Sequence, residues 1–233
     1  MDRIFEDRSS GYRHESKYFI SQSEAAKLRL RFDGVMKRDP HSDENRRYVI
    51  SSVYFDDAED HSLAASDAGL PYRKKYRIRA YNYDDSFISL EKKEKRLDLS
   101  RKTQLRISKE DYREIMLGRP ETLKKYPGAL AKEFYYDVKF AGYRSKTIVE
   151  YKREVYTYPI SDVRITLDTD IRGAVCGCDM FERPALAPVY PAFAVLLEVK
   201  YNHILPEFIA SLLPRDVMSR TANCKYVLGR TYV

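Results

Sequence analysis

The sequence predicts an α+β protein built on an antiparallel eight-stranded β-barrel, which forms a tunnel with helices packed around it. Residues 75–95 have the pattern of a hairpin with one apolar face and one densely charged face. At least five strands of this charged type are predicted, and helix-capping residues lie between several of them. With 233 residues, the chain is long enough for such a barrel and its helices in one domain.

The predicted hairpin at 75–95 alternates in both of its strands. Tyr76, Ile78 and Ala80 share the apolar face of the first strand, and residues 82–85 supply turn chemistry. The charged face carries Lys75, Arg77, Arg79 and Tyr81, and then Glu91, Lys93 and Lys95. A solvated antiparallel sheet could show the same alternation, so the prediction of a barrel depends on its repetition elsewhere.

Before the hairpin, residues 1–11 are predicted as a polar lead-in and residues 12–233 as a single domain. Ser21 and Glu24 form a capping box, which predicts the start of a helix. The predicted elements are a strand at 13–20 with Arg13, Glu15 and Lys17 on one face, that helix, a charged loop at 37–46, a strand at 48–55, and a short helix and turn at 58–70.

After the hairpin, the pattern predicts further strands interrupted by helices. Ser108 is expected to cap a helix that ends before Gly118, and Pro127 interrupts a second helical stretch. The predicted strands are 97–107, 148–158, 163–171 and 195–201; the helices are 108–117, 121–140, one starting at Pro206 and one around 219–229, with a loop at 173–192. In the strand at 163–171, Arg164, Thr166, Asp168 and Asp170 oppose Ile165, Leu167 and Ile171.

Composition excludes several classes of protein. No run approaches the roughly 18 apolar residues of a membrane span, and the first residues lack the apolar core of a signal peptide. We therefore expect a cytoplasmic protein. Three cysteines argue against a disulfide framework, and Cys176 and Cys178 have no matching pair for zinc. A net charge of +7 from 42 basic and 35 acidic residues suits a polyanionic ligand better than a membrane surface.

The charged strand faces have a chemical consequence if they line a barrel. Charges facing such an interior are costly unless they are paired. An inner face rich in arginine and lysine therefore implies a guest with several negative charges. A phosphate chain is the natural candidate, because guanidinium groups match phosphate oxygens bidentately.

Seven short motifs then resemble a known family in their order along the chain. The motifs are Glu15-x-Lys17-Tyr18, Lys75-x-Arg77-x-Arg79, Leu90-Glu91-x-Lys93, Tyr151-x-Arg153, Arg164-x-x-x-Asp168-x-Asp170, Leu197-Glu198-Val199-Lys200 and Lys225-Tyr226. Over about residues 12–230, the chain is similar to the VTC polyphosphate polymerase domain of the triphosphate tunnel metalloenzymes, the CYTH-like superfamily. The resemblance implies a barrel tunnel and transfer of the terminal phosphoryl group of ATP to a growing polyphosphate.

The resemblance also implies residue roles. Phosphate binding and catalysis would fall to Lys17, Arg77, Arg79, Lys93, Arg153 and Arg164, with Lys102, Tyr151, Lys200 and Lys225 as further phosphate contacts. Glu198 matches the ligand of a divalent cation, Mn²⁺ or Mg²⁺, and Glu15 and Glu91 are possible helpers. From the residues alone, Glu198 could instead be a salt-bridge partner of an interior lysine, although the metal role is favoured. Asp168 and Asp170 are expected to orient arginines.

This chain departs from the family pattern at two positions, Arg13 and Cys224. Hydrolytic members carry Glu-x-Glu-x-Lys on the first strand, where Arg13 replaces the leading glutamate. The final helix often reads Ser-Lys-Tyr, but here Cys224 precedes Lys225, and Arg220 could compensate for the poorer thiol donor. The eukaryotic relatives add a regulatory domain and membrane helices that are not seen in this sequence, so moving the product across a membrane would need a membrane-protein partner.

Two alternatives to a polymerase remain open. One is an inorganic triphosphatase or related phosphohydrolase of the same fold, which the missing glutamate disfavours. The other is a non-catalytic module that binds polyphosphate, a nucleotide or RNA. RNA-binding sheets usually present aromatic residues for base stacking, whereas the basic faces here carry only Tyr81 and Tyr151, so we expect no nucleic acid partner.

Overall fold

The computed structural model describes residues 11–40, 42–43, 46–97, 99–175, 179–189, 194–213, 219–220 (backbone only) and 224–231. Apart from Gly11, the predicted lead-in lies outside these residues. Cys176, Cys178 and the side chain of Arg220 lie outside them as well.

Eight strands close into an antiparallel barrel, which confirms the predicted fold class. Around the ring, the order is β1, β6, β5, β4, β3, β7, β8, β10 and back to β1. The strands are β1 (Arg13–Ser21), β3 (Tyr48–Asp56), β4 (Tyr72–Tyr81), β5 (Asp84–Arg96), β6 (Leu99–Ile107), β7 (Arg144–Tyr158), β8 (Val163–Val175) and β10 (Ala194–Tyr201). The short strands β2 (Lys37–Arg38), β9 (Ala187–Pro188) and β11 (Ser219–Arg220) pair with β7, β8 and β1.

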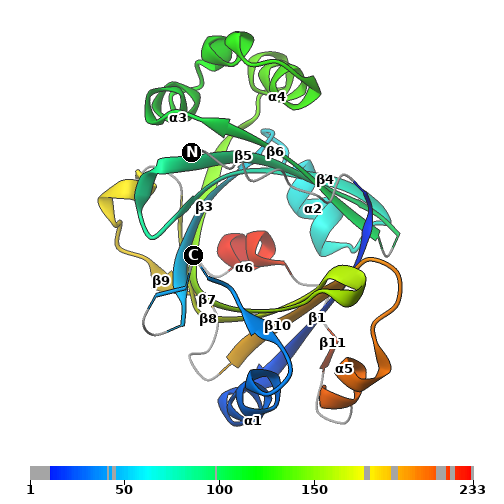
Figure 1. Ribbon diagram of the computed structural model, residues 1–233. Coiled ribbons are helices and arrows are strands. Elements are labelled where there is room, and N and C mark those ends of the chain that lie inside the picture. Colours follow the sequence, from blue (N-terminus) through cyan, green and yellow to red (C-terminus); the bar gives the residue numbers. More distant parts are fainter. Residues whose placement is uncertain are drawn as a thin grey trace, which may run out of the picture.

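Helices cover two sides of the barrel, and one lies inside it (Figure 1). On one side, α3 and α4 lie over β5 and β6, whereas α1 and α5 lie on the opposite side. The helices are α1 (Gln22–Asp33), α2 (His61–Asp67), α3 (Lys109–Met116), α4 (Ala129–Phe140), α5 (Glu207–Leu212) and α6 (Lys225–Thr231). Short 3₁₀ helices are η1 (Pro120–Lys125), η2 (Ile160–Asp162) and η3 (Met180–Glu182).

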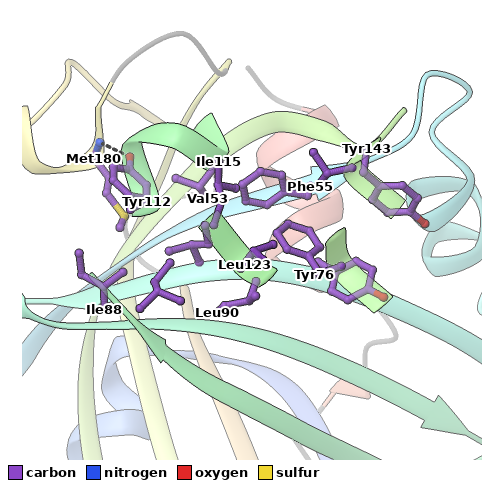
Figure 2. Close-up of a cluster of buried hydrophobic side chains, with 14 of the residues drawn as sticks. Val53, Phe55, Tyr76, Ile88, Leu90, Tyr112, Ile115, Leu123, Tyr143 and Met180 are labelled. Carbon is purple, nitrogen blue, oxygen red and sulfur yellow. Dashed lines mark hydrogen bonds between the residues drawn. The ribbon is translucent and has the colours of Figure 1, made fainter. Parts of the chain in front are cut away.

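A core outside the barrel wall fixes which strand faces point inward. Tyr76 and Ile78 of β4, and Ile88 and Leu90 of β5, are fully buried in one cluster with residues of α3 and α4. Figure 2 shows Tyr76, Ile88 and Leu90 in this cluster. The ring of Tyr76 packs on Phe134 of α4, with ring centroids 4.8 Å apart. Because strand residues alternate between faces, this packing directs the odd-numbered, charged residues of both strands into the barrel.

The start signals of two helices are confirmed. The Ser21 side chain accepts a hydrogen bond from the Glu24 amide at 3.1 Å, and Ser108 caps α3 through the Asp111 amide. Gly118 follows α3 with a φ of +73°, which favours glycine. The prediction of a terminal helix around 219–229 is wrong in its bounds. The helix spans Lys225–Thr231, and residues 219–220 form a short strand.

The alternation predicted for 163–171 breaks at Asp170. Asp170 has a φ of +51°, and the pairing of β7 with β8 shifts register between Glu150 and Lys152. Ile165 and Leu167 pack outside the barrel beneath α1 and α5, but Ile171 joins the cluster inside it. A bulge therefore reverses the faces beyond this point.

The C-terminal helix α6 occupies the interior of the barrel, where Figure 1 shows it surrounded by the strands. Tyr226 stacks on Tyr54 of β3 at 5.2 Å and donates a hydrogen bond to Asp56 at 2.7 Å. A side chain at Gly229 would place its Cβ 2.5 Å from Val149, so the helix can approach β7 only with glycine there. No helix in the described part of the chain has the length and apolar character needed to cross a membrane.

Candidate functional site

The first group of candidate residues contains two glutamates, which lie on the neighbouring strands β1 and β10. Glu15 and Lys17 of β1 lie beside Lys200 and Glu198 of β10, with which they pair in register. Lys93 reaches them from β5, and its Nζ lies 2.6 Å from both carboxylate oxygens of Glu15. This contact joins strands that are not neighbours in the sheet, because β6 separates β5 from β1.

Within this group, lysines surround both carboxylates. Lys17 Nζ lies 3.1 Å from Glu15 Oε1 and 3.8 Å from Glu198 Oε1. Lys200 Nζ lies 3.4 Å from Glu198 Oε1 and 3.9 Å from Glu15 Oε2. Three half-buried lysines therefore share two buried carboxylates.

The pKa values of this group reflect the excess of positive charge. Burial would raise the pKa of Glu15, but Lys93, Lys17 and Lys200 hold it well below its ordinary value. Burial lowers the pKa of Lys93 to about 7, since the attraction of Glu15 is opposed by the other two lysines. An anion entering the barrel would stabilise the protonated form of Lys93.

A second group lies on β4, β5 and β6. Arg77 donates through Nε to Glu91 Oε2 at 2.7 Å and through Nη1 to the Tyr54 hydroxyl at 3.2 Å. Arg79 Nη1 lies 3.4 Å from Glu91 Oε1, and Lys102 Nζ lies 3.7 Å from the same oxygen. A single buried carboxylate thus faces three cations.

A third group connects β7, β8 and α6. Arg153 binds both oxygens of Asp168, at 2.6 and 2.7 Å, and Lys225 Nζ lies 2.5 Å from Asp168 Oδ2. Lys225 also lies 4.4 Å from the centre of the Tyr151 ring. Arg153 Nη2 is 3.6 Å from Glu198 Oε2, which links this group to the first.

Arg164 neighbours the first group, because it pairs in register with Lys200 of β10, but its carboxylate partner is a different one. Its Nη2 contacts Asp39 at 3.1 Å and the Tyr48 hydroxyl at 3.2 Å, and about a third of its side chain is exposed. Arg164 is therefore adjacent to the first group along the sheet but pairs with Asp39. Asp168 holds Arg153 and Asp170 holds Arg172, in agreement with the role predicted for these aspartates.

Glu15 and Glu198 are the pair that best fits a divalent cation. Both carboxylates contact the same ammonium group, because Lys17 Nζ lies within 4 Å of each of them. In the described ranges, no three His, Cys, Asp or Glu side chains are grouped to hold a metal ion, and Glu91 pairs with arginines instead. Mg²⁺ is often held by one or two carboxylates together with substrate phosphates. Glu15 and Glu198 could hold a metal ion in this way only if phosphate oxygens supplied the remaining ligands.

Sequence reasoning did not assign a role to Lys75 or recognise its contact with Cys224. Lys75 Nζ lies 3.0 Å from the Cys224 sulfur, just before α6. Burial would raise the pKa of the thiol, but Lys75 and Lys17 lower it to about 6. Alternation already placed Lys75 on the same face as Arg77; its partner came from the far end of the chain, which no local pattern reveals.

We expect Cys224→Ser to change the pH dependence of anion binding. Above about pH 6 the thiol becomes a thiolate, whose negative charge repels a phosphate chain, whereas serine stays neutral. The variant should bind tripolyphosphate about fivefold more tightly than wild type at pH 7.5, about 1 kcal/mol, with the difference vanishing toward pH 5. Titration calorimetry of both proteins across this range checks it, because protonation of the ligand is common to both. Parallel pH profiles would contradict the prediction.

Comparison with known proteins adds family information to this geometry. The model of a family described as the VTC domain matches residues 12–233. Among solved structures, the chain is similar to the PH1819 protein of Pyrococcus horikoshii OT3, at 14% identity and a TM-score of 0.50, covering 93% of this chain and 97% of that one. It is also similar to HpAC1 from Hippeastrum, an adenylyl cyclase candidate with a dominant triphosphatase activity, at 13% identity and a TM-score of 0.50, covering 86% and 83%. No curated protein sequence matches the chain. At these identities, the structural similarities concern the fold alone.

Proposed function

Because the chain belongs to the VTC domain family, we propose that it is an ATP-dependent polyphosphate polymerase that works inside its barrel. In this reaction, the bond from the terminal phosphorus of ATP to its bridging oxygen breaks. A terminal oxygen of the polyphosphate chain forms the new bond to that phosphorus, and ADP leaves. We also propose that the protein acts in the cytoplasm and that a membrane-protein partner would be needed for export of the product.

The observation that carries the proposal is the imbalance of buried charge. Across the three groups, eight lysine and arginine side chains share the four carboxylates Glu15, Glu91, Asp168 and Glu198. Each of these carboxylates contacts at least two cations. Three of these cations are buried and five are half-buried. Cations in such excess with little access to solvent are costly unless an anion joins them, and a phosphate chain offers a negative charge at every unit.

The residues divide the work of phosphoryl transfer between neutralisation and positioning. Lys17, Lys93 and Lys200 surround the two carboxylates and would neutralise the oxygens of the transferred group. Arg77 and Arg79, held by Glu91, would align the chain for in-line attack. A divalent cation held by Glu15 and Glu198 would add Lewis-acid stabilisation of phosphoryl oxygens.

The first strand favours a polymerase over a hydrolase. Arg13 stands where hydrolytic members carry a glutamate, and its guanidinium lies 3.2 Å from Asp162. This position therefore supplies no carboxylate to activate water.

Incubation of the purified protein with ATP and Mn²⁺ or Mg²⁺ tests the proposal. Polyphosphate formed in proportion to ADP, seen on a stained gel, is the expected result. Release of orthophosphate without polymer would favour the triphosphatase. Tripolyphosphate binding with neither reaction would show a non-catalytic module.

Arg79→Ala should weaken phosphate binding itself. The substitution removes a buried guanidinium and leaves Glu91 with less counter-charge, so tripolyphosphate affinity should fall by roughly 1.5–3 kcal/mol, about 10- to 150-fold. Arg101→Ala is the matched control, because Arg101 pairs with Glu94 on the outer face of the sheet. Calorimetry at fixed ionic strength measures both variants. Equal affinities for the two would show that Arg79 does not contact the chain.

A further inference from the structure

Two serine hydroxyls inside the barrel have no hydrogen-bond partner among the described residues. Ser52 of β3 is 0% exposed and Ser89 of β5 is 2% exposed. Their neighbours in sequence, Val53, Ile88 and Leu90, pack in the core outside the wall. Alternation therefore directs both hydroxyls to the inner face of the barrel.

The two serines flank the same arginine. Ser52 pairs in register with Arg79 on one side, and Ser89 pairs with Arg79 on the other. The Arg79 Nε–H is buried and also lacks a partner, although Nη1 reaches the Tyr81 hydroxyl at 3.3 Å and Glu91 at 3.4 Å. Three unpaired donor groups thus lie on three adjacent strands at one level of the barrel.

The chemistry of these groups selects the ligand they would take. Unpaired buried polar groups are rare in folded proteins, and each one raises the free energy of the folded state. The guanidinium charge disfavours a cation, and hydroxyls can donate to an anionic oxygen as readily as they accept from water. An oxyanion with several acceptor oxygens matches one guanidinium N–H and two O–H donors.

We propose that Ser52, Arg79 and Ser89 together form a phosphoryl subsite, which holds a unit of the phosphate chain beyond the carboxylates Glu15 and Glu198. This subsite rests on the proposed function, since it takes its ligand class from it. It adds two neutral donors to a set of predicted phosphate contacts that are mostly charged. Neutral donors bind a phosphoryl oxygen without adding to the repulsion among the buried cations.

The subsite has a consequence for stability that a purely structural role would not have. If the hydroxyls bind a ligand, they lower the stability of the ligand-free protein, because they are then buried without a hydrogen-bond partner. Removing them should stabilise that state while weakening the ligand-bound state.

The test uses the double variant Ser52→Ala/Ser89→Ala, with tripolyphosphate and pyrophosphate as probes. Without ligand, its melting temperature should equal or exceed that of wild type by about 2–4 °C. Its affinity for tripolyphosphate should fall about 5- to 30-fold. The loss should be smaller for pyrophosphate, because a shorter chain occupies fewer subsites.

Ser66→Ala is the matched control. Ser66 lies on α2, is 2% exposed and also has an unpaired hydroxyl, but it belongs to no strand of the barrel wall. The control should leave tripolyphosphate affinity unchanged.

Three results would overturn the subsite. Unchanged tripolyphosphate affinity in the double variant would show that the hydroxyls hold only water. A lowered melting temperature of the ligand-free variant would show a structural role. An equal loss of affinity in Ser66→Ala would show that the effect is not local. If wild type itself bound no tripolyphosphate, the proposed function would fail first, which separates the two failures.

Discussion

Glu198→Gln should lower metal-dependent turnover by at least about 100-fold while leaving tripolyphosphate binding intact or tighter. The carboxylate lies 3.4 Å from Lys200 and 3.6 Å from Arg153, so the substitution removes a negative charge from a cationic site. A polyanion gains from that loss. A divalent cation loses a hard anionic ligand that an amide replaces poorly.

Two measurements on the same preparations check this prediction. One is ATP consumption with polyphosphate formation, and the other is tripolyphosphate affinity without metal. Glu94→Gln is the control. Glu94 forms its ion pairs with Lys92 and Arg101, and neither of these belongs to the cationic groups inside the barrel. Full activity in Glu198→Gln would rule out a metal-binding role for Glu198 and leave it as a partner of the lysines.

Asp168→Asn should destabilise the fold more than any other single change considered above. Asp168 is 0% exposed and neutralises both Arg153 and Lys225. Its loss takes the Asp168 charge away from buried Lys225 and leaves Arg153 only the more distant Glu198, 3.6 Å away. We expect the free energy of unfolding to fall by about 3–5 kcal/mol. Tripolyphosphate should restore more stability to this variant than to wild type, because it supplies the missing negative charge.

Asp170→Asn provides a matched control two residues away. Asp170 is about a third exposed and pairs with Lys152 and Arg172, and asparagine tolerates its positive φ. Urea denaturation of both variants is the measurement, and equal loss of stability would contradict the prediction.

The ion pairs of Asp168 also predict that the protein loses stability in acid. Burial would raise the pKa of Asp168, but Arg153 and Lys225 hold it below its ordinary value. Its stabilising contribution is therefore present above about pH 4, the pKa in the unfolded chain, and is lost as the pH falls further.

Much of the fold could be predicted from the sequence because the signals are local. The alternation of Tyr76, Ile78 and Ala80 with lysine and arginine specified both faces of β4, and the barrel confirms them. The Ser21 and Ser108 caps marked the starts of α1 and α3, since a cap depends on residues three apart. Local signals failed at Asp170, where a bulge changes the register, and near residue 219, where a short strand precedes α6.

The candidate site could likewise be predicted only where local signals suffice. Strand parity alone placed Glu15, Lys17, Glu91 and Lys93 on faces that could meet, and the resemblance assigned their roles, which stay predictions. Only the closed barrel decided that Lys93 contacts Glu15 across β6, or that Lys225 of α6 reaches Asp168. The unpaired hydroxyls of Ser52 and Ser89 also became visible only there. Alternation fixes the direction of each side chain, but partners across a barrel depend on strand stagger and closure, which residues far apart in the sequence determine jointly.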